Sequence, residues 1–201
     1  MDNIWNFLYP RVFSVVYKSS IISLTEFEND IFLTFDDGPD DESTTEILQI
    51  LNEYKAKATF FCTGKNIIKH PYLLKLIIDQ GHRIGNHGFE HLDGLKVSQN
   101  KFIENVLKGY DTTGSNLFRP PYGRMKIQQY LWAKENFKII LWNHMTFDFK
   151  NNENKSYENK IIKAGSIIVM HDSKKCKHLT TSFLRSILKY NCNKNFIPIP
   201  A

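Results

Sequence analysis

The sequence has too few cysteines for a disulfide framework or a cysteine-based zinc site. Its 201 residues contain three, Cys62, Cys176 and Cys192, and no two of them are separated by only two residues. An odd number of thiols cannot all pair within one chain, and Cys-x-x-Cys spacing is the usual signature of a cysteine zinc site. Stability and chemistry therefore have to come from a packed core and from other residue types.

Long apolar runs and clustered charge are also missing. Residues 1–17 are apolar and aromatic, but Asp2 opens the segment and Pro10-Arg11 interrupts it, so a secretory signal peptide is not indicated. No stretch approaches the roughly 18 apolar residues of a membrane span. Lys and Arg are spread along a chain whose net charge is only +5, which does not predict a nucleic-acid partner. We expect no transmembrane segment and take the cytoplasm as the default compartment, with export or attachment to a membrane surface left open.

The remaining composition is that of one soluble domain. Hydrophobic residues make up 42% and charged residues 23% of the chain, which is ordinary for a globular protein. The length is sufficient to bury a sizeable core. We find no internal repeat and no linker. The expected organisation is a monomer with an apolar and aromatic extension at 1–28 and a single catalytic domain at 29–201.

Strand and helix patterns alternate along this domain. Apolar runs bounded by turn residues predict strands at 31–35, 58–62, 83–85, 117–118, 138–142, 166–170 and 196–197. Helical spacing of apolar residues predicts helices at 43–51, 71–81, 102–107, 126–136, around 161–162 and at 183–190. The alternation indicates parallel strands with helical crossovers, in an open sheet or a barrel. In both architectures function gathers at the carboxyl ends of the strands.

Two adjacent aspartates, Asp36 and Asp37, follow the first of these strands directly and precede the Gly38-Pro39 turn. Neighbouring carboxylates at the end of a buried strand repel each other, an arrangement that makes sense if a metal ion or a shared proton separates their roles. One of them could instead cap the next helix while the other faces solvent. The pair by itself leaves both interpretations open.

Two histidines, His87 and His91, lie four residues apart in a loop after a short strand. With one carboxylate they would form a two-His, one-carboxylate metal site with positions open for water and substrate. The same residues also fit the inverted zinc-protease pattern H-x-x-E-H. That pattern requires a helix, and Gly85, Gly88 and Gly94 are poor helix residues. A chance pair of exposed histidines remains an alternative from the spacing alone.

Five motifs in order resemble the polysaccharide deacetylase family, the NodB-homology domain of carbohydrate esterase family 4. They are Thr34-Phe35-Asp36-Asp37-Gly38-Pro39, the His87/His91 pair after Gly85-Asn86, Arg119-Pro120-Pro121-Tyr122-Gly123, Asp148-Phe149, and Val169-Met170-His171-Asp172. The resemblance covers the chain from about Ile31 to its end and implies a distorted (β/α) barrel of roughly seven parallel strands. One departure is Gly88, which stands where the family usually has Ser or Thr.

The resemblance implies a metal-dependent hydrolase that removes N-acetyl groups from a polysaccharide or oligosaccharide, such as a chitooligosaccharide or peptidoglycan. One divalent ion, Zn²⁺ or alternatively Co²⁺, Ni²⁺ or another, would bind Asp37, His87 and His91. The resemblance also implies that Asp36 is the general base, with Arg119 as its ion-pair partner. His171 would be the general acid, and Asp148 would orient it. Tyr122 would donate its backbone N–H to the oxyanion and contact the substrate, while Val169 and Phe149 would form the acetyl pocket.

Three other functions stay open at this stage. They are a non-catalytic carbohydrate-binding relative, an O-acetyl esterase acting on a glycan, and an iron oxygenase built on the same triad of two histidines and one carboxylate. Such oxygenases usually have a β-rich cupin pattern, which differs from the alternation seen here. The sequence contains no Gly-x-Ser-x-Gly motif, so a serine nucleophile is not indicated.

Overall fold

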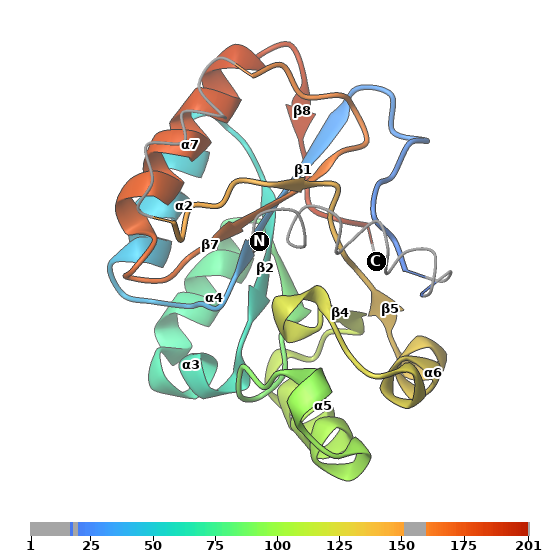
Figure 1. The fold of residues 1–201 in the computed structure, drawn as a ribbon. Helices are drawn as coiled ribbons and strands as arrows, with labels where there is room; N and C mark the ends of the chain where they lie inside the picture. The colour runs from blue at the N-terminus through green and yellow to red at the C-terminus, as the bar shows by residue number, and fades with distance from the viewer. Residues whose placement is uncertain (1–16, 18–19, 151–159, 201) are drawn as a thin grey trace.

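A computed structural model describes residue 17, residues 20–150 and residues 160–200 (Figure 1). Its strands are β1 (Asp30–Asp36), β2 (Ala58–Cys62), β3 (Arg83–Asn86), β4 (Leu117–Phe118), β5 (Lys138–Ile139), β6 (His144–Met145), β7 (Ile167–His171) and β8 (Asn195–Phe196). Seven of them pair in parallel in the order β5-β4-β3-β2-β1-β7-β6, and β8 pairs in parallel with β1. The sheet curls into a distorted half-barrel, so the predicted single α/β domain with about seven parallel strands is confirmed.

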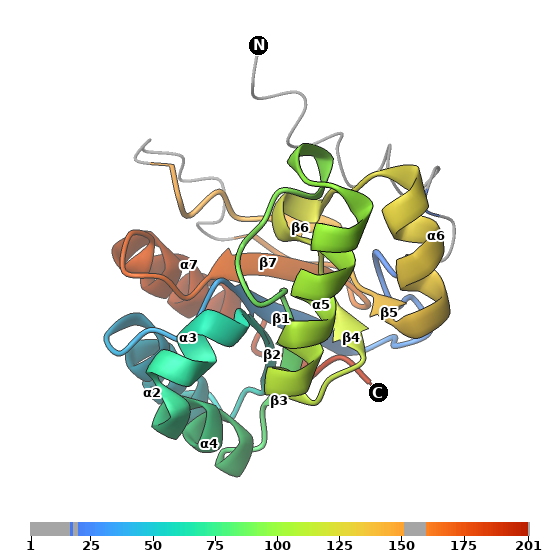
Figure 2. The same ribbon diagram turned by 90° about the horizontal axis from the view of Figure 1, so that it is seen from below.

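The helices cover the outside of this half-barrel. They are α2 (Ser43–Glu53), α3 (Gly64–Lys69), α4 (Pro71–Asp79), α5 (Gln99–Thr113), α6 (Ile127–Asn136) and α7 (Lys177–Tyr190), with short 3₁₀ turns at Gly94–Lys96 and Pro121–Gly123. Figures 1 and 2 show α2, α4 and α7 grouped beside β1, β2 and β7, whereas α5 and α6 lie beside β4 and β5. This arrangement leaves the carboxyl ends of the central strands together at one end of the sheet.

The alternation of side chains along β1 assigns its residues to two environments. Ile31, Leu33 and Phe35 belong to the large apolar cluster beneath α2, α4 and α7. Phe32 belongs to a second cluster, which fills the inside of the half-barrel. Because successive side chains in a strand point to opposite faces, Thr34 and Asp36 lie on the same side as Phe32. A polar residue at the end of this strand therefore projects into the concave interior.

The predicted elements form with two main differences. The strand expected at 138–142 is limited to Lys138–Ile139, because the following residues pair with the segment before β1, with Leu141 donating its backbone N–H to the Ile21 carbonyl (2.8 Å). The helix expected around Ile161 and Ile162 is wrong: residues 160–163 form no helix. Ile161 is 80% exposed and Ile162 is buried, so one side chain at this site, not a helical face, contributes to the core. The short helix α3 was not predicted.

The part of the predicted N-terminal extension that the structure describes packs onto the domain. Tyr17 is fully buried against Tyr130, with ring centroids 4.5 Å apart, and its hydroxyl donates to the carbonyl of Met125. Leu24 joins the interior cluster around Phe32. Residues 1–16 and 18–19 of the extension lie outside the described residues.

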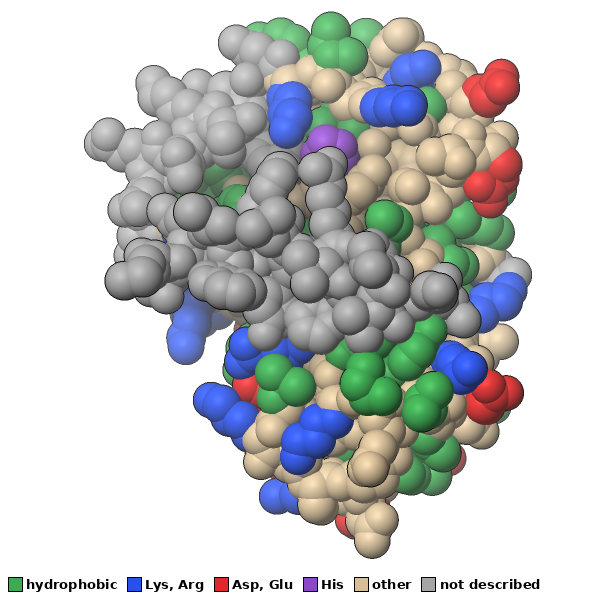
Figure 3. Space-filling model, turned by 45° about the vertical axis from the view of Figure 1, so that its right-hand side comes forward, with side chains coloured by type: hydrophobic (Ala, Val, Ile, Leu, Met, Phe, Trp, Pro, Cys, Tyr) green, Lys and Arg blue, Asp and Glu red, His purple; other side chains and the backbone are tan. Residues whose placement is uncertain are grey.

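None of the helices in the described ranges combines the length and the hydropathy needed to cross a membrane. Figure 3 shows Lys and Arg side chains of the described residues at several separate places on one face.

Candidate active site

A cavity of about 460 Å³ opens at the carboxyl ends of the central strands. Most of the predicted site residues lie in its wall: Asp36, Asp37, His87, His91, Tyr122, Phe149, Val169 and His171. The other two, Arg119 and Asp148, are buried behind it and contact Asp36 and His171 respectively. The structure thus brings together every residue that the motifs singled out, although they are spread over more than 130 positions of the sequence.

The turn that carries the two aspartates is held by Asp172, the fully buried residue after His171. Its carboxylate accepts the backbone N–H of Gly38 and the hydroxyl of Thr44, both at 2.8 Å, and its own N–H donates to the Asp36 carbonyl (3.1 Å). A Cβ at Gly38 would lie 1.9 Å from this carboxylate, so no larger residue fits there. Between these anchors Asp37 takes a left-handed backbone conformation, φ +83°, which is uncommon for a residue other than Gly.

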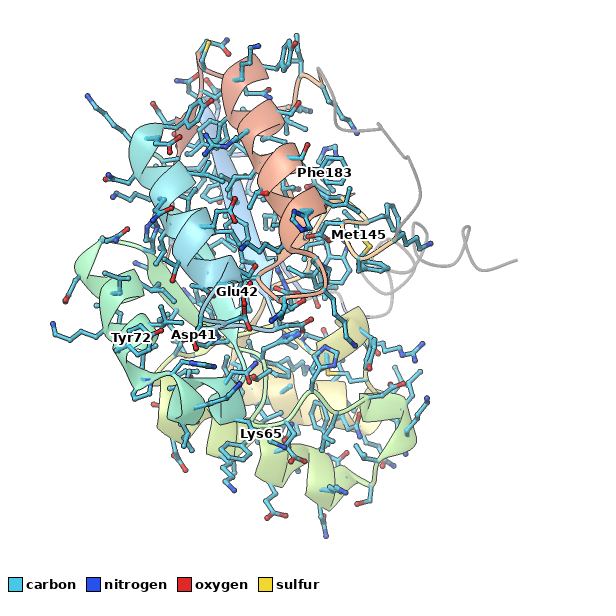
Figure 4. All side chains as sticks on the ribbon, turned by 90° about the vertical axis from the view of Figure 1, so that its left-hand side faces the viewer. Asp41, Glu42, Lys65, Tyr72, Met145 and Phe183 are labelled. Carbon is cyan, nitrogen blue, oxygen red and sulfur yellow. The ribbon has the colours of Figure 1, made fainter. Side chains whose placement is uncertain are left out.

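Surface contacts connect the same loop to its neighbours. Glu42 is labelled with Asp41 in Figure 4. Its carboxylate lies 3.1 Å from the ammonium of Lys174, in the loop after β7, and 3.6 Å from that of Lys177, at the start of α7. Asp41 accepts a hydrogen bond from the hydroxyl of Tyr72. Exposed pairs of this kind contribute only ~0–1 kcal/mol each. They help to align the loops, whereas the buried Asp172 contacts determine the turn.

The carboxylate of Asp37 faces two imidazole nitrogens. His91 Nε2 lies 3.2 Å and His87 Nε2 lies 3.6 Å from Asp37 Oδ1. His87 Nδ1 lies 2.8 Å from the carbonyl oxygen of Arg119, to which it can only donate. Nδ1 therefore carries a proton, and Nε2 is the ring nitrogen that faces the carboxylate.

These three side chains have the properties of a cation site. Asp37 Oδ1 is buried without a hydrogen-bond partner, and one donor atom from each residue lies within 4.8 Å of the others. Burial lowers the pKa of His91 to about 4, so this imidazole is neutral at neutral pH. Although burial raises the pKa of Asp37, its interaction with His87 outweighs burial and holds that pKa well below its usual range. One ionised carboxylate oxygen and two imidazole Nε2 atoms therefore converge, and Asp37, His87 and His91 can hold a divalent metal ion.

The loop that carries the two histidines depends on two asparagines. Asn86 accepts the backbone N–H of Gly88 (2.8 Å) and donates to the Val106 carbonyl (3.0 Å). Asn105 of α5 accepts the N–H of Glu90 (2.8 Å) and donates to its carbonyl (2.9 Å). Gly88, which departs from the usual Ser or Thr of the family pattern, fits this loop closely. A Cβ at Gly88 would lie 2.5 Å from the Asn105 amide, and its φ of +80° disfavours any other residue.

We expect Gly88→Ala to lower the free energy of unfolding by about 1–3 kcal/mol, because the left-handed backbone and the Asn105 contact both oppose a side chain. Gly114→Ala is a matched control: Gly114 also has a positive φ, +64°, but nothing lies within 4 Å of its Cβ position. Urea unfolding of both variants separates backbone strain from the clash. Weaker metal binding is expected for Gly88→Ala alone. Equal losses of stability with unchanged metal affinity would contradict a role of Asn105 in shaping this loop.

Asp36 is paired with a fully buried guanidinium. Arg119 Nη1 donates to Asp36 Oδ1 and to Thr34 Oγ1, both at 2.7 Å. Its Nε donates to the Ile140 carbonyl (3.2 Å) and its Nη2 to the Leu141 carbonyl (3.0 Å). The guanidinium carbon lies 4.1 Å from the centre of the Phe61 ring. This network holds the Asp36 carboxylate in one position beside the metal-ligand group.

His171 is oriented by Asp148. Its Nδ1 lies 2.8 Å from Asp148 Oδ1, and its backbone N–H donates to Asp148 Oδ2 (2.7 Å). The hydroxyl of Thr180 also donates to Oδ2 (2.6 Å). Burial lowers the pKa of His171, but the Asp148 carboxylate outweighs burial and raises that pKa to about 9. With Nδ1 bound to Asp148, a protonated His171 can present Nε2–H to the cavity.

We expect Asp148→Asn to change the pH dependence of activity. Because the pKa of His171 is raised to about 9, its imidazole stays protonated through neutral pH and loses that proton above about 9. Without the Asp148 charge that pKa falls, so the alkaline limb of kcat/KM should move to lower pH, and kcat/KM at pH 8 should fall about 10²–10⁴-fold. Thr180→Val removes a hydrogen bond to Asp148 but no charge, and it should shift the limb much less. An unchanged limb in Asp148→Asn would mean that His171 is not the titrating acid.

The remaining predicted residues surround these groups. Tyr122 has a left-handed backbone, φ +61°, and its ring contacts that of His91 edge-on, with centroids 4.5 Å apart. The Phe149 ring contacts His171 edge-on at 5.2 Å and is 43% exposed. Val169 is buried at the base of the cavity. Their assignment to the oxyanion and to the acetyl group stays a prediction.

Sequence reasoning gave no positioning role to several residues that hold the site: Thr34, Asn86, Asn105, Asp172 and Thr180. Three of these stand in or beside the motifs. Thr34 opens the first motif, Asn86 directly precedes His87, and Asp172 ends the last motif. Asn105 lies inside a predicted helix and Thr180 shortly before another, and nothing in the sequence distinguishes either from a surface residue.

Comparison with known proteins gives a consistent result. Residues 25–136 match the family model described as polysaccharide deacetylase. Two proteins of Bacillus cereus, both named peptidoglycan-N-acetylglucosamine deacetylase, are 36% identical to the chain, over 84% and 80% of its length. The chain spans 62% of the length of the first and 81% of the second. A crystal structure of the Bc1960 peptidoglycan N-acetylglucosamine deacetylase with an N-oxidanyl-benzamide ligand superimposes with a TM-score of 0.86 at 31% identity, covering 94% of each chain.

Proposed function

The chain belongs to the polysaccharide deacetylase family (carbohydrate esterase family 4, NodB-homology domain), and from this membership we propose that it is a metal-dependent hydrolase of N-acetyl groups on a peptidoglycan-type glycan. The class is a hydrolase of carbon–nitrogen bonds. The names of the Bacillus cereus relatives favour the acetamide of N-acetylglucosamine as the bond cleaved. The observation that carries the proposal is one cavity in which Asp37, His87 and His91 converge between an Arg-paired aspartate and an Asp-paired histidine.

In this proposal the chain's own residues divide the proton transfers of amide hydrolysis. A divalent ion held by Asp37, His87 and His91, which we propose to be Zn²⁺, supplies Lewis acidity that lowers the pKa of water and polarises the acyl carbonyl. Asp36, kept in place by Arg119, accepts the proton of the attacking water. His171 donates a proton to the departing nitrogen, so the products are acetate and a free amine on the sugar.

The same arrangement gives roles to the cavity wall. Val169 and Phe149 provide the apolar surface for the acetyl methyl group, and the backbone N–H of Tyr122 is the proposed donor to the acyl oxygen. The exposed ring of Tyr122, 55% accessible, offers a surface on which a sugar can stack. A non-catalytic carbohydrate-binding relative would not need these groups to be arranged around one acetyl site. An O-acetyl esterase would use the same groups to hydrolyse an ester instead of an amide.

The test is release of acetate from a panel of glycans: peptidoglycan, chitooligosaccharides and an O-acetylated glycan. We expect release from the N-acetylated substrates, its loss in Asp36→Asn, and its loss on chelation with recovery when Zn²⁺ is restored. Release from the O-acetylated glycan alone would favour the esterase. Activity that survives both Asp36→Asn and chelation would refute the mechanism, and no release from any substrate would refute the catalytic function.

A further inference from the structure

A second group of metal-ligand side chains consists of His171 and Cys176, which line the same cavity, and Asp148, which is buried behind it. One donor atom from each of Asp148, His171 and Cys176 lies within 4.8 Å of the others. Cys176 immediately precedes α7, is 4% exposed and lines the cavity, yet the proposed hydrolysis does not use it. Thiolate, imidazole and carboxylate together are donors that zinc accepts in proteins.

We propose that Asp148, His171 and Cys176 form a second, weaker binding site for Zn²⁺, and that occupation of this site inhibits the enzyme. The inhibitory effect rests on the proposed function, because it assumes that His171 acts as the acid. The binding site itself rests only on the three donors and on the position of His171 and Cys176 in the cavity wall.

The electrostatics of this wall favour a cation but delay its binding. Burial and the negative charges of Asp148, Asp37 and Asp172 raise the pKa of the Cys176 thiol to about 11. The same charges attract a divalent cation, whereas the thiol proton must be displaced for sulfur to bind it. Asp37, His87 and His91 all line the cavity, whereas Asp148 lies behind it and both of its oxygens accept hydrogen bonds, from His171 and Thr180. The Cys176 site should therefore fill only after the Asp37-His87-His91 site.

Binding at the second site would remove the acid from the reaction. The ion takes the place of the thiol proton and of one proton of the His171 imidazolium, and both protons pass to solvent. Asp148, now a ligand, no longer stabilises a protonated imidazole. His171 then has no proton to give to the departing amine, so an excess of Zn²⁺ should slow turnover that the first equivalent had enabled.

Cobalt provides a readout that does not depend on turnover, because a thiolate bound to Co²⁺ gives an intense near-ultraviolet charge-transfer band that nitrogen and oxygen ligands lack. The titration uses Cys192→Ser protein, which removes the exposed thiol and leaves Cys62 fully buried. We expect no band with the first equivalent of Co²⁺, a band with the second, and no band in the double variant with Cys176→Ser. Deacetylation by the Cys192→Ser protein should fall as the band grows.

Absence of the band in excess Co²⁺, or its persistence after Cys176→Ser, would overturn the second site. If the Cys176→Ser variant does not fold, X-ray absorption of the Cys192→Ser protein with two equivalents of Zn²⁺ decides instead. A sulfur neighbour of zinc supports the site, and its absence overturns it. A protein that shows the thiolate band but deacetylates no glycan would refute the proposed function and still support the metal site.

Discussion

Replacing Asp37 with alanine should abolish metal-dependent activity while the protein remains folded. Asp37 supplies the only carboxylate oxygen of the three-residue group, and that oxygen is buried without a hydrogen-bond partner. Changes to residues that merely orient metal ligands already weaken affinity about 10–100-fold, so loss of a ligand should exceed that range. We expect more than about 100-fold weaker binding of Zn²⁺ and no measurable deacetylation.

Thermal and chemical unfolding with and without Zn²⁺ give an independent measurement. Metal at 100 times its dissociation constant should stabilise the wild-type protein by about 2.7 kcal/mol, because it binds only the folded chain. The Asp37→Ala variant should show none of this stabilisation. Asp79→Ala, which removes an exposed carboxylate paired with Lys75, should bind metal as the wild type does. Metal affinity within tenfold of wild type in Asp37→Ala would rule out the assigned site.

Replacing Arg119 with methionine should produce the largest loss of stability among the site residues. The guanidinium is fully buried and donates hydrogen bonds to Thr34, Asp36 and two backbone carbonyls. Methionine keeps much of the side-chain volume but leaves the Asp36 carboxylate buried without its counter-ion. Breaking a buried pair in this way typically costs about 3–5 kcal/mol. Urea unfolding should therefore show a loss of that size, and activity should fall with it.

A double variant identifies the cause of this loss. If the uncompensated charge dominates, Arg119→Met combined with Asp36→Asn should recover a substantial part of the stability lost in Arg119→Met alone. The matched control is Arg185→Met, since Arg185 pairs with Glu53 on the surface, where both side chains are about half exposed. That pair should contribute no more than about 1 kcal/mol. Equal losses for the two arginine variants would show that burial does not strengthen the Arg119–Asp36 pair.

Most of the sheet and the identity of the site residues could be predicted from local sequence. Strands such as Ala58–Cys62 are buried on both faces, and a strand in that environment is recognised in the sequence as a nearly continuous apolar run. Polar residues at the ends of such runs meet at one edge of a parallel sheet, which is why the sequence alone allows Asp36, Arg119 and His171 to be grouped. The helix expected around Ile161 failed because two adjacent apolar residues do not define a helical face.

The sequence by itself determined the alternating architecture, the family and the residues of the candidate site, because these depend on patterns within short segments. Only the tertiary structure decided how those residues are held. Asp172 holds the Gly38 turn from 134 positions away, and Asn105 of α5 shapes the histidine loop. The nearness of Asp148 to His171 and Cys176 likewise exists only in the folded chain. Such contacts join elements distant in sequence, and their geometry follows from how the helices and strands pack together.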